Sequence, residues 1–238
     1  MVERAPVSEK LRGKKVMITG ALGRLGKVLV EGLKDCCKLV LVDINAGEGV
    51  VKADVSNMES LEQMFDKVGT VNYIVHLAGT AEHDADWEIV LKNNIIGTYN
   101  TYEYARKHQV GRVIQASSTH IFGLYPEYPD KPSGKPIPVY AERRPDSDYA
   151  VSKAFGEDLA RYYYDRYGIE TIVIRIGALG DEDKQYPPYH LLQLKYADAV
   201  QIFRLALETD ILYGIFYAIS GKSPVFDMRS TRDRLGFT

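Results

Sequence analysis

The glycine-rich segment TGALGRLG, residues 19–26, constrains the fold more than any other part of the sequence. It follows the apolar run KVMIT, which predicts a buried strand, and it opens a stretch with helix-like apolar spacing, residues 25–33. In this setting Gly20 permits a tight turn, Gly23 lets a pyrophosphate approach the backbone, and Gly26 lets the helix pack close to the strand. Free N–H groups and the helix dipole favour phosphate charge at the helix start. The segment predicts a dinucleotide site, with a glycine-rich turn that binds nothing as the alternative.

The same alternation of apolar strand and helix continues along the 238 residues. Strands that are apolar throughout and alternate with helices are typical of a parallel sheet covered on both faces. The sequence therefore predicts an α/β, doubly wound parallel sheet, the Rossmann fold. The predicted strands are 15–19, 38–43, 49–54, 71–79, 111–118, 169–177 and 214–220, and the predicted helices are 25–33, 57–65, 86–108, 147–167 and 196–208.

Two stretches interrupt this alternation. Residues 119–146 hold six of the ten prolines, and residues 178–190 are a second irregular stretch. A long irregular connection inside a compact domain is usually functional. Both stretches follow the ends of predicted strands, where ligands bind in open α/β sheets. We expect them to form two sides of a substrate pocket.

Acidic residues at the ends of two predicted strands bear on the choice of dinucleotide. Asp43 lies about 20 residues beyond the glycine-rich loop, where a carboxylate accepts hydrogen bonds from ribose hydroxyls and repels a 2′-phosphate. This favours NAD over NADP. Arg24 could accommodate the extra phosphate, but a solvated position or a pyrophosphate contact is the favoured interpretation. Asp54 either meets the adenine or caps a turn, and the sequence leaves both open.

Composition excludes several classes of partner. A formal net charge of −2 gives no electrostatic case for nucleic acid or an anionic membrane, and no apolar run is long enough to span a bilayer. Adjacent Cys36 and Cys37 cannot easily bridge each other and, with no apolar leader at the N-terminus, favour a reducing compartment, so the cytoplasm is predicted. His76, His83 and His108 lack ligand spacing with one another or with the cysteines, so no metal site is predicted.

The segment PDSDYAVSK, residues 145–153, places Tyr149 and Lys153 one helical turn apart. A free tyrosine, with a pKa of about 10, is a poor base at neutral pH. A lysine ammonium on the same helix face, together with the positive charge of oxidised nicotinamide, favours the phenolate and should lower the pKa of the phenol. Ser118, at the end of a predicted strand, could hold a substrate hydroxyl in reactive geometry. The pair could arise by chance in a tyrosine-rich chain, but the dinucleotide loop and Ser118 argue against chance.

The order of these motifs resembles the extended branch of the short-chain dehydrogenase/reductase superfamily. More narrowly, NIIGTYN, SSTHIFGLYP, YAVSKAFGE and VIRIG resemble the uronate dehydrogenase group and related sugar dehydrogenases. The resemblance implies NAD-dependent oxidation of a cyclic sugar at the anomeric carbon to a lactone. It implies an NAD-binding Rossmann domain at 1–177, a small substrate-binding C-terminal portion at 178–238 that completes the same fold, and a homodimer paired through helices 86–108 and 147–167.

The loop and the resemblance together assign site residues. Catalysis is assigned to Ser118, Tyr149, Lys153 and Asn94, the last as a brace for the helix backbone and the lysine. Cofactor binding is assigned to Gly20, Gly23, Arg24, Leu25, Gly26, Asp43, Asp54, Val55, Leu77, Ala78, Gly79, Asn94, Tyr149, Lys153 and Ile176. Substrate binding is assigned to Thr80, Ser118, Thr119, His120 and Tyr149, although His120 could equally be a structural residue.

Two departures from the family pattern leave the sugar unnamed. Only about 60 residues follow the RIG motif, which favours a free sugar or sugar phosphate over a nucleotide sugar. The family's carboxylate-gripping serine after that motif is matched here by Ala178, and the following loop has no arginine. A uronate, a neutral aldose and a phosphorylated aldose all stay open. So do a nucleotide-sugar epimerase or dehydratase that recycles its NAD and a non-catalytic dinucleotide-sensing protein.

Overall fold

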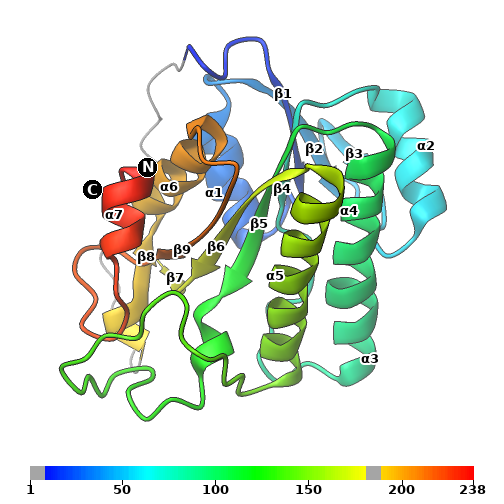
Figure 1. The fold of residues 1–238 in the computed structure, drawn as a ribbon. Coiled ribbons are helices and arrows are strands. Elements are labelled where there is room, and N and C mark those ends of the chain that lie inside the picture. The colour runs from blue at the N-terminus through cyan, green and yellow to red at the C-terminus, as the bar shows by residue number, and fades with distance from the viewer. Residues whose placement is uncertain (1–8, 181–188) are drawn as a thin grey trace.

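A seven-stranded parallel sheet forms the centre of the protein, in a computed structural model that describes residues 9–180 and 189–238 (Figure 1). The strand order is β3-β2-β1-β4-β5-β6-β9, so the chain winds outward from β1 in both directions. This confirms the predicted doubly wound fold. The strands are β1 (Lys15–Thr19), β2 (Lys38–Asp43), β3 (Val50–Lys52), β4 (Tyr73–His76), β5 (Arg112–Ser118), β6 (Glu170–Ile176) and β9 (Tyr213–Ala218).

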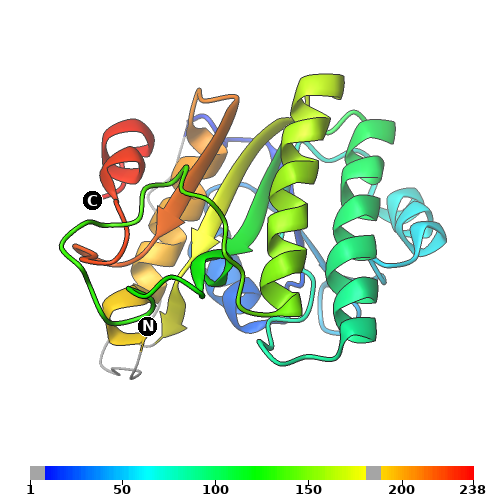
Figure 2. The same ribbon diagram turned by 60° about the horizontal axis from the view of Figure 1, so that its bottom comes forward.

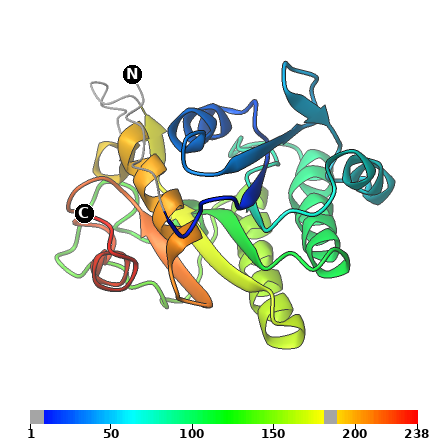
Figure 3. The same cartoon turned by 90° about the horizontal axis from the view of Figure 1, so that it is seen from above.

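Helices cover both faces of the sheet, as the apolar strands predict (Figure 3). Each face has its own buried cluster, with Leu29 and Phe203 on one side and Tyr102 and Tyr163 on the other. The first face carries α1 (Arg24–Leu33), α6 (Tyr196–Glu208) and α7 (Arg229–Leu235). The second face carries α2 (Met58–Val68), α4 (Gly97–Lys107) and α5 (Asp148–Tyr167).

Two of the predicted helices begin at side-chain caps. Asn57 accepts a hydrogen bond from the N–H of Ser60 at the start of α2, which confirms the predicted cap. Ser147 accepts from the N–H of Ala150 at the start of α5 and so fixes where the helix carrying Tyr149 begins.

Several elements differ from the sequence prediction. Strand β4 ends at His76 rather than Gly79, because the chain leaves the ladder there and Gly79 adopts a φ of +143°. The predicted helix 86–108 is three consecutive segments, α3 (Trp87–Val90), a π-helical turn η1 (Leu91–Ile96) and α4. Missed elements are the polar helix α7 and a small parallel pair, β7 (Ala178–Gly180) and β8 (Gln193–Lys195). The short 3₁₀ turn η3 (Tyr189–Leu192), also missed, directly precedes β8.

The long connection after β5 runs across the carboxyl ends of the strands (Figure 2). It begins with the 3₁₀ turn η2 (Thr119–Phe122) and then continues without regular structure, as predicted. The N–H of Ile137 donates to the carbonyl of Val225 at 2.8 Å, and the N–H of Asp227 donates to the carbonyl of Ile137 at 3.0 Å. These bonds attach the connection to the segment that precedes α7. Residues 181–188 of the other predicted irregular stretch lie outside the described residues.

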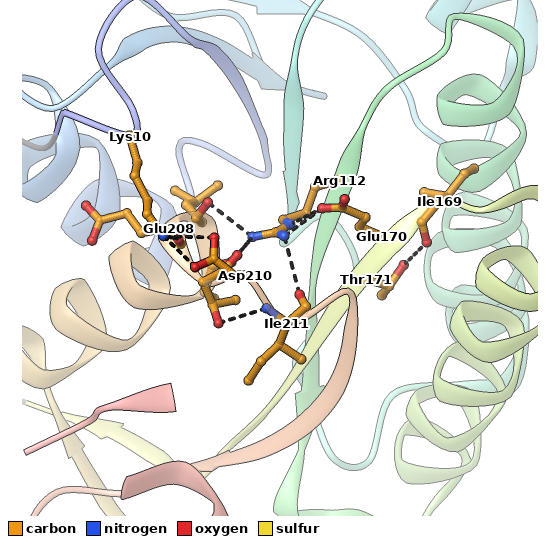
Figure 4. Close-up of polar contacts among 11 residues, drawn as sticks. Lys10, Arg112, Ile169, Glu170, Thr171, Glu208, Asp210 and Ile211 are labelled. Atoms are coloured by element: carbon orange, nitrogen blue, oxygen red, sulfur yellow. Dashed lines mark hydrogen bonds and ion pairs between the residues drawn. The ribbon is translucent and has the colours of Figure 1, made fainter. Parts of the chain in front are cut away.

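Arg112 joins elements at the opposite end of the strands (Figure 4). Its buried guanidinium donates to the Glu170 carboxylate at 2.6 and 2.9 Å and to the backbone carbonyl of Thr209 at 2.6 Å. It also reaches the carbonyls of Ala206 and Leu207, at the C-terminal end of α6. The last carbonyls of a helix have no partner within it, so Arg112 supplies partners that the buried helix end needs.

The described residues of the C-terminal portion, 178–180 and 189–238, pack on the same sheet as the rest of the chain. They add β9 to the sheet edge beside β6 and lay α6 against α1. The predicted division of the chain at residue 177 stays a prediction. The proposed part of these residues in substrate binding also stays a prediction. In the described parts of the chain, no helix combines the length and the apolar character needed to cross a membrane.

Candidate active site

Two adjoining pockets lie at the carboxyl ends of the strands, where the sheet order reverses between β1 and β4. The first has a volume of ≈ 300 Å³ and the second ≈ 500 Å³. The predicted cofactor residues on the first are Gly20, Gly23, Asp43, Asp54, Val55, Leu77, Ala78 and Gly79. Those on the second are Gly20, Gly23, Arg24, Leu25, Gly26, Leu77, Gly79, Tyr149, Lys153 and Ile176.

The glycine-rich loop forms the floor shared by both pockets. Gly20 has a φ of +71°, and a Cβ there would lie 2.9 Å from the backbone nitrogen of Ala78. At Gly26 a Cβ would lie 2.2 Å from the carbonyl oxygen of Gly20, so only glycine permits this packing of α1. Gly23 precedes the first residue of α1 and has no side chain to occupy the first N–H groups of the helix. The loop therefore presents the geometry that a phosphate requires.

Asp43 lies at the edge of the first pocket in a fixed orientation. Its two carboxylate oxygens accept hydrogen bonds from the N–H of Leu22 at 3.0 Å and from the N–H of Asn45 at 2.9 Å. The Asp43 side chain is thus held where the ribose hydroxyls of a dinucleotide would lie beside the glycine-rich loop.

Asp54 also lines the first pocket but caps a turn. Its Oδ1 accepts from the N–H and the hydroxyl of Ser56, and Lys92 Nζ lies 3.5 Å from its Oδ2. Partial burial raises the pKa of Asp54, but the bonds from Ser56 and the charge of Lys92 outweigh burial and hold the pKa below its ordinary value. The structure thus favours the turn-capping alternative, with the carboxylate still on the pocket wall.

Three of the residues assigned to catalysis lie together in the second pocket, one at the end of a strand and two near the start of a helix. Ser118 is the last residue of β5, Tyr149 lies in the first turn of α5, and Lys153 follows one turn later. The Lys153 ammonium lies 5.5 Å from the centre of the Tyr149 ring and 3.4 Å from the carbonyl oxygen of Ala116. The helical spacing places both side chains on the face of α5 that packs toward the sheet.

The pKa of Tyr149 is set mainly by its burial in the second pocket. Burial raises its pKa above the ordinary value of a tyrosine, and a hydrogen bond from the Ser118 hydroxyl opposes this only in part. Burial of the phenolate is the largest cause, and the Asp146 carboxylate adds to it. The predicted lowering also counts the positive charge of oxidised nicotinamide, so it stays a prediction. Burial also lowers the pKa of Lys153 to about 8, so the lysine keeps most of its charge at neutral pH.

Asn94 lines neither pocket and acts through backbone and hydroxyl groups. It lies in the π-helical turn η1, where its Oδ1 accepts from the N–H of Thr80 at 2.8 Å. Its Nδ2 donates to the hydroxyl of Ser152 at 3.0 Å, and that hydroxyl donates to the carbonyl of Tyr149 at 2.6 Å. Asn94 therefore links the loop after β4 to the first turn of α5. These contacts reach the backbone of α5, whereas Lys153 donates to the carbonyl of Ala116, so a brace for the lysine stays a prediction.

The five predicted substrate residues, Thr80, Ser118, Thr119, His120 and Tyr149, all line the second pocket. Sequence reasoning missed Tyr128 and Tyr189, which flank His120 with ring centres 5.4 and 5.9 Å from its own. Both tyrosines lie in the two irregular stretches that were predicted to form the sides of a pocket. The sequence therefore predicted the segments that line the pocket but not which of their residues do so. Together with Tyr149, whose ring centre is 6.1 Å from that of His120, they make an aromatic wall.

Asp146 is a third residue that sequence reasoning missed, and it contacts two histidines. Its Oδ2 lies 2.8 Å from His120 Nδ1, and its Oδ1 lies 3.3 Å from Nε2 of His83, which also lines the pocket. Partial burial raises the pKa of Asp146, but the hydrogen bond and charge of His120 outweigh burial and keep the pKa low. No sequence spacing signals this group, because its members come from three separate segments.

The chain is similar to known dehydrogenases over most of its length. Residues 16–186 match the NAD dependent epimerase/dehydratase family. A uronate dehydrogenase of Pseudomonas putida is 39% identical over 84% of this chain and 75% of its own. An L-arabinose 1-dehydrogenase (NAD(P)(+)) of Haloferax volcanii is 33% identical, over 83% of this chain and 84% of its own. The solved structure of a mutant uronate dehydrogenase from Agrobacterium tumefaciens complexed with NAD superposes with a TM-score of 0.81, at 31% identity, covering 94% of this chain and 84% of that chain.

Proposed function

Because this chain belongs to the NAD dependent epimerase/dehydratase family, we propose that it is an NAD-dependent dehydrogenase that oxidises a sugar at its anomeric carbon to a lactone. The observation that carries this proposal is the meeting of Ser118, Tyr149 and Lys153 where the second pocket opens onto the glycine-rich loop. The relatives named uronate dehydrogenase and L-arabinose 1-dehydrogenase support the same reaction class.

The protein's own residues would handle the proton of the reacting hydroxyl. Ser118 holds that hydroxyl by a hydrogen bond beside the phenol, and Tyr149 takes its proton as general base. Lys153 supplies positive charge next to the phenol and can hold a ribose hydroxyl of the cofactor, so one residue orients the cofactor and favours the phenolate. NAD, when bound, accepts the hydride from the anomeric carbon and adds the positive charge of its oxidised ring.

NAD rather than NADP is the cofactor that Asp43 favours. A carboxylate fixed by the N–H groups of Leu22 and Asn45 cannot turn away from a 2′-phosphate without losing those bonds. Arg24 lines the second pocket and not the first, which favours contact with the pyrophosphate over contact with the adenosine ribose.

The substrate side of the pocket suits a sugar ring. Tyr128, Tyr189 and His120 offer aromatic faces, and Thr80 and Thr119 offer hydroxyls. Ala178 lines the same pocket with a methyl group, which cannot hydrogen-bond a carboxylate. A neutral aldose therefore joins a uronate and a sugar phosphate as a substrate to test.

A homodimer is part of the proposal. Exposed apolar side chains lie along the helices on the second face of the sheet, and their exposed fractions are 44% for Trp87, 47% for Tyr99, 44% for Val151 and 51% for Tyr162. Large apolar side chains gathered on neighbouring helices are typical of a protein interface. Sedimentation analysis over a concentration series tests this, and a monomer at all concentrations would contradict it.

The experiment that tests the function is a screen for NADH absorbance over neutral aldoses, uronates and sugar phosphates, with NAD and NADP in parallel. We expect NADH with at least one free sugar, and a loss of turnover of about 10³-fold or more in Tyr149→Phe, because the general base is removed. NAD binding should persist in that variant. The matched control is Tyr140→Phe, a tyrosine that is 87% exposed and lines neither pocket.

Three outcomes would contradict all or part of the proposal. If no sugar gives NADH, the dehydrogenase assignment is wrong. Tightly retained NAD without net NADH would favour an epimerase or dehydratase that recycles its cofactor. Unchanged turnover in Tyr149→Phe would keep the reaction but remove the base.

A further inference from the structure

His83, His120 and Asp146 form a cluster that the proposed hydride and proton transfers do not use. The three residues offer two imidazole nitrogens and one carboxylate oxygen that lie within 4.8 Å of one another. They come from the loop after β4, from η2 and from the segment before α5, so only the tertiary fold brings them together.

The cluster is held in place before any ligand arrives. The Ser147 hydroxyl donates to Asp146 Oδ1 at 3.1 Å. A Cβ at Gly123 would lie 1.7 Å from Asp146 Oδ2, so the backbone packs directly against the carboxylate and limits its rotation. His120 is fixed by its 2.8 Å contact with Asp146 and by packing against Tyr128.

His83 gives the cluster an entry route. Its side chain is 49% exposed, whereas those of His120 and Asp146 are 20% and 14% exposed. An ion could therefore reach the cluster from solvent at His83 and be retained by the two more buried groups.

We propose that His83, His120 and Asp146 bind one divalent transition-metal ion of the zinc class. Two imidazole nitrogens and one carboxylate are ligands that Zn²⁺, Ni²⁺ and Co²⁺ accept, whereas Mg²⁺ and Ca²⁺ prefer all-oxygen sets. Three protein ligands leave at least one further position for water or another oxygen ligand.

The bound ion would lie in the part of the second pocket that receives the sugar. His83 and His120 both line that pocket, and the ring centre of His120 is 6.1 Å from that of Tyr149. An ion bound by these side chains fills space that the sugar needs and withdraws His120 from it. Zinc should therefore inhibit by competing with the sugar and not with NAD, whose pyrophosphate loop lies at the other end of the pocket.

The test of binding is a Zn²⁺ titration of the full chain by calorimetry, which does not depend on any enzymatic activity. We expect one site, weakened at least about tenfold in His83→Ala because one of three ligands is lost. Since His83 is at the surface, this variant should fold. Asp146→Asn should weaken the site as well. His190→Ala, an exposed histidine that lines neither pocket, is the matched control and should bind as the unmodified protein does.

A Co²⁺ titration distinguishes this site from the cysteines. Nitrogen and oxygen ligands give d–d bands without the thiolate charge-transfer absorption that Cys36 or Cys37 would add. Equal Zn²⁺ affinity in His83→Ala and the unmodified protein, or a thiolate band for the tightest site, would overturn the proposal.

The inhibition arm rests on the proposed function and is separate from the binding arm. Once a sugar that the enzyme oxidises is known, Zn²⁺ should raise the apparent KM for that sugar and leave the apparent KM for NAD unchanged. The variant His83→Ala should show a smaller rise in the KM for the sugar. Competition with NAD instead would overturn the placement of the ion. If no sugar is oxidised, the proposed dehydrogenase activity fails while calorimetry still decides the metal site.

Discussion

Replacing Glu157 by Gln should destabilise the protein strongly, because Glu157 balances a buried charge beneath the active site. The Glu157 and Arg175 side chains are 2% and 3% exposed, and two N–H groups of Arg175 donate to the two carboxylate oxygens at 2.8 Å each. The Ser117 hydroxyl donates to the same carboxylate at 2.7 Å. Arg175 also donates to the carbonyl of Val139, so the pair ties α5, β5, β6 and the 119–146 connection together.

The magnitude follows from what the substitution leaves behind. Gln keeps the shape of Glu but turns one acceptor into a donor that faces an Arg175 donor, and it leaves the guanidinium charge buried without a counter-ion. Breaking a buried ion pair on one side costs about 3–5 kcal/mol of unfolding free energy. For a chain of this size each kcal/mol shifts Tm by about 2–4 °C, so we expect a fall of roughly 6–20 °C.

The assay is urea unfolding followed by far-UV circular dichroism, with Asp158→Asn as the matched control. Asp158 is the next residue of α5, and its carboxylate forms an ion pair with Arg143 at 2.7 Å. The Asp158 side chain is 70% exposed, so losing this pair should lower the free energy of unfolding by about 1 kcal/mol or less. The double variant Glu157→Gln/Arg175→Met should recover part of the loss, because it removes the unpaired charge.

A loss of less than about 1 kcal/mol in Glu157→Gln would refute this reasoning, since it would mean that water or another group compensates the buried guanidinium. The reasoning would also be refuted if the double variant lost more unfolding free energy than the two single variants lose together. In that case the pair would stabilise the fold by its geometry and not through charge balance.

Three further predictions follow from single residues. Burial lowers the pKa of His76 to about 3, so between pH 6.5 and 3 the unfolded chain binds a proton that the folded chain does not. The free energy of unfolding therefore falls as the pH falls, by about 1.4 kcal/mol at pH 5.5. Urea unfolding of His76→Gln should show a smaller fall with pH than the unmodified protein. Gly26→Ala should abolish NAD binding measured by calorimetry, because its Cβ would lie 2.2 Å from the Gly20 carbonyl; wild-type affinity would contradict this. Asp43→Asn should weaken NAD binding about tenfold and reduce discrimination against NADP in the NADH assay, since it removes a charged acceptor for the ribose; unchanged discrimination would show that Asp43 does not select the cofactor.

The order and type of most core elements were predictable from local sequence. The six strands from β1 to β6 are apolar runs, and the helices between them have apolar residues at helical spacing, so burial on two faces of a parallel sheet is readable in the chain. The helix α7 and the pair β7 and β8 were missed because they are short, and their sequences have no strong periodicity. The shortening of β4 was missed because Gly79 leaves the ladder for a conformation that no local pattern announces.

The sequence by itself determined the dinucleotide loop and the candidate base. Gly20 and Gly26 are required by backbone geometry within eight residues, and Gly23 between them leaves the first N–H groups of the helix uncovered. Tyr149 and Lys153 share a helix face through helical spacing alone, so the loop and the pair are both local properties. Only the tertiary structure decided the pKa of Tyr149, because its desolvation depends on residues far along the chain.

The tertiary structure alone also brought Asp146 to two histidines and placed Tyr128 and Tyr189 beside His120. These contacts form where irregular segments from distant parts of the chain converge over the carboxyl edge of the sheet. Such segments have no repeating pattern in sequence, and their side chains are positioned by the packing of the strands and helices that they connect.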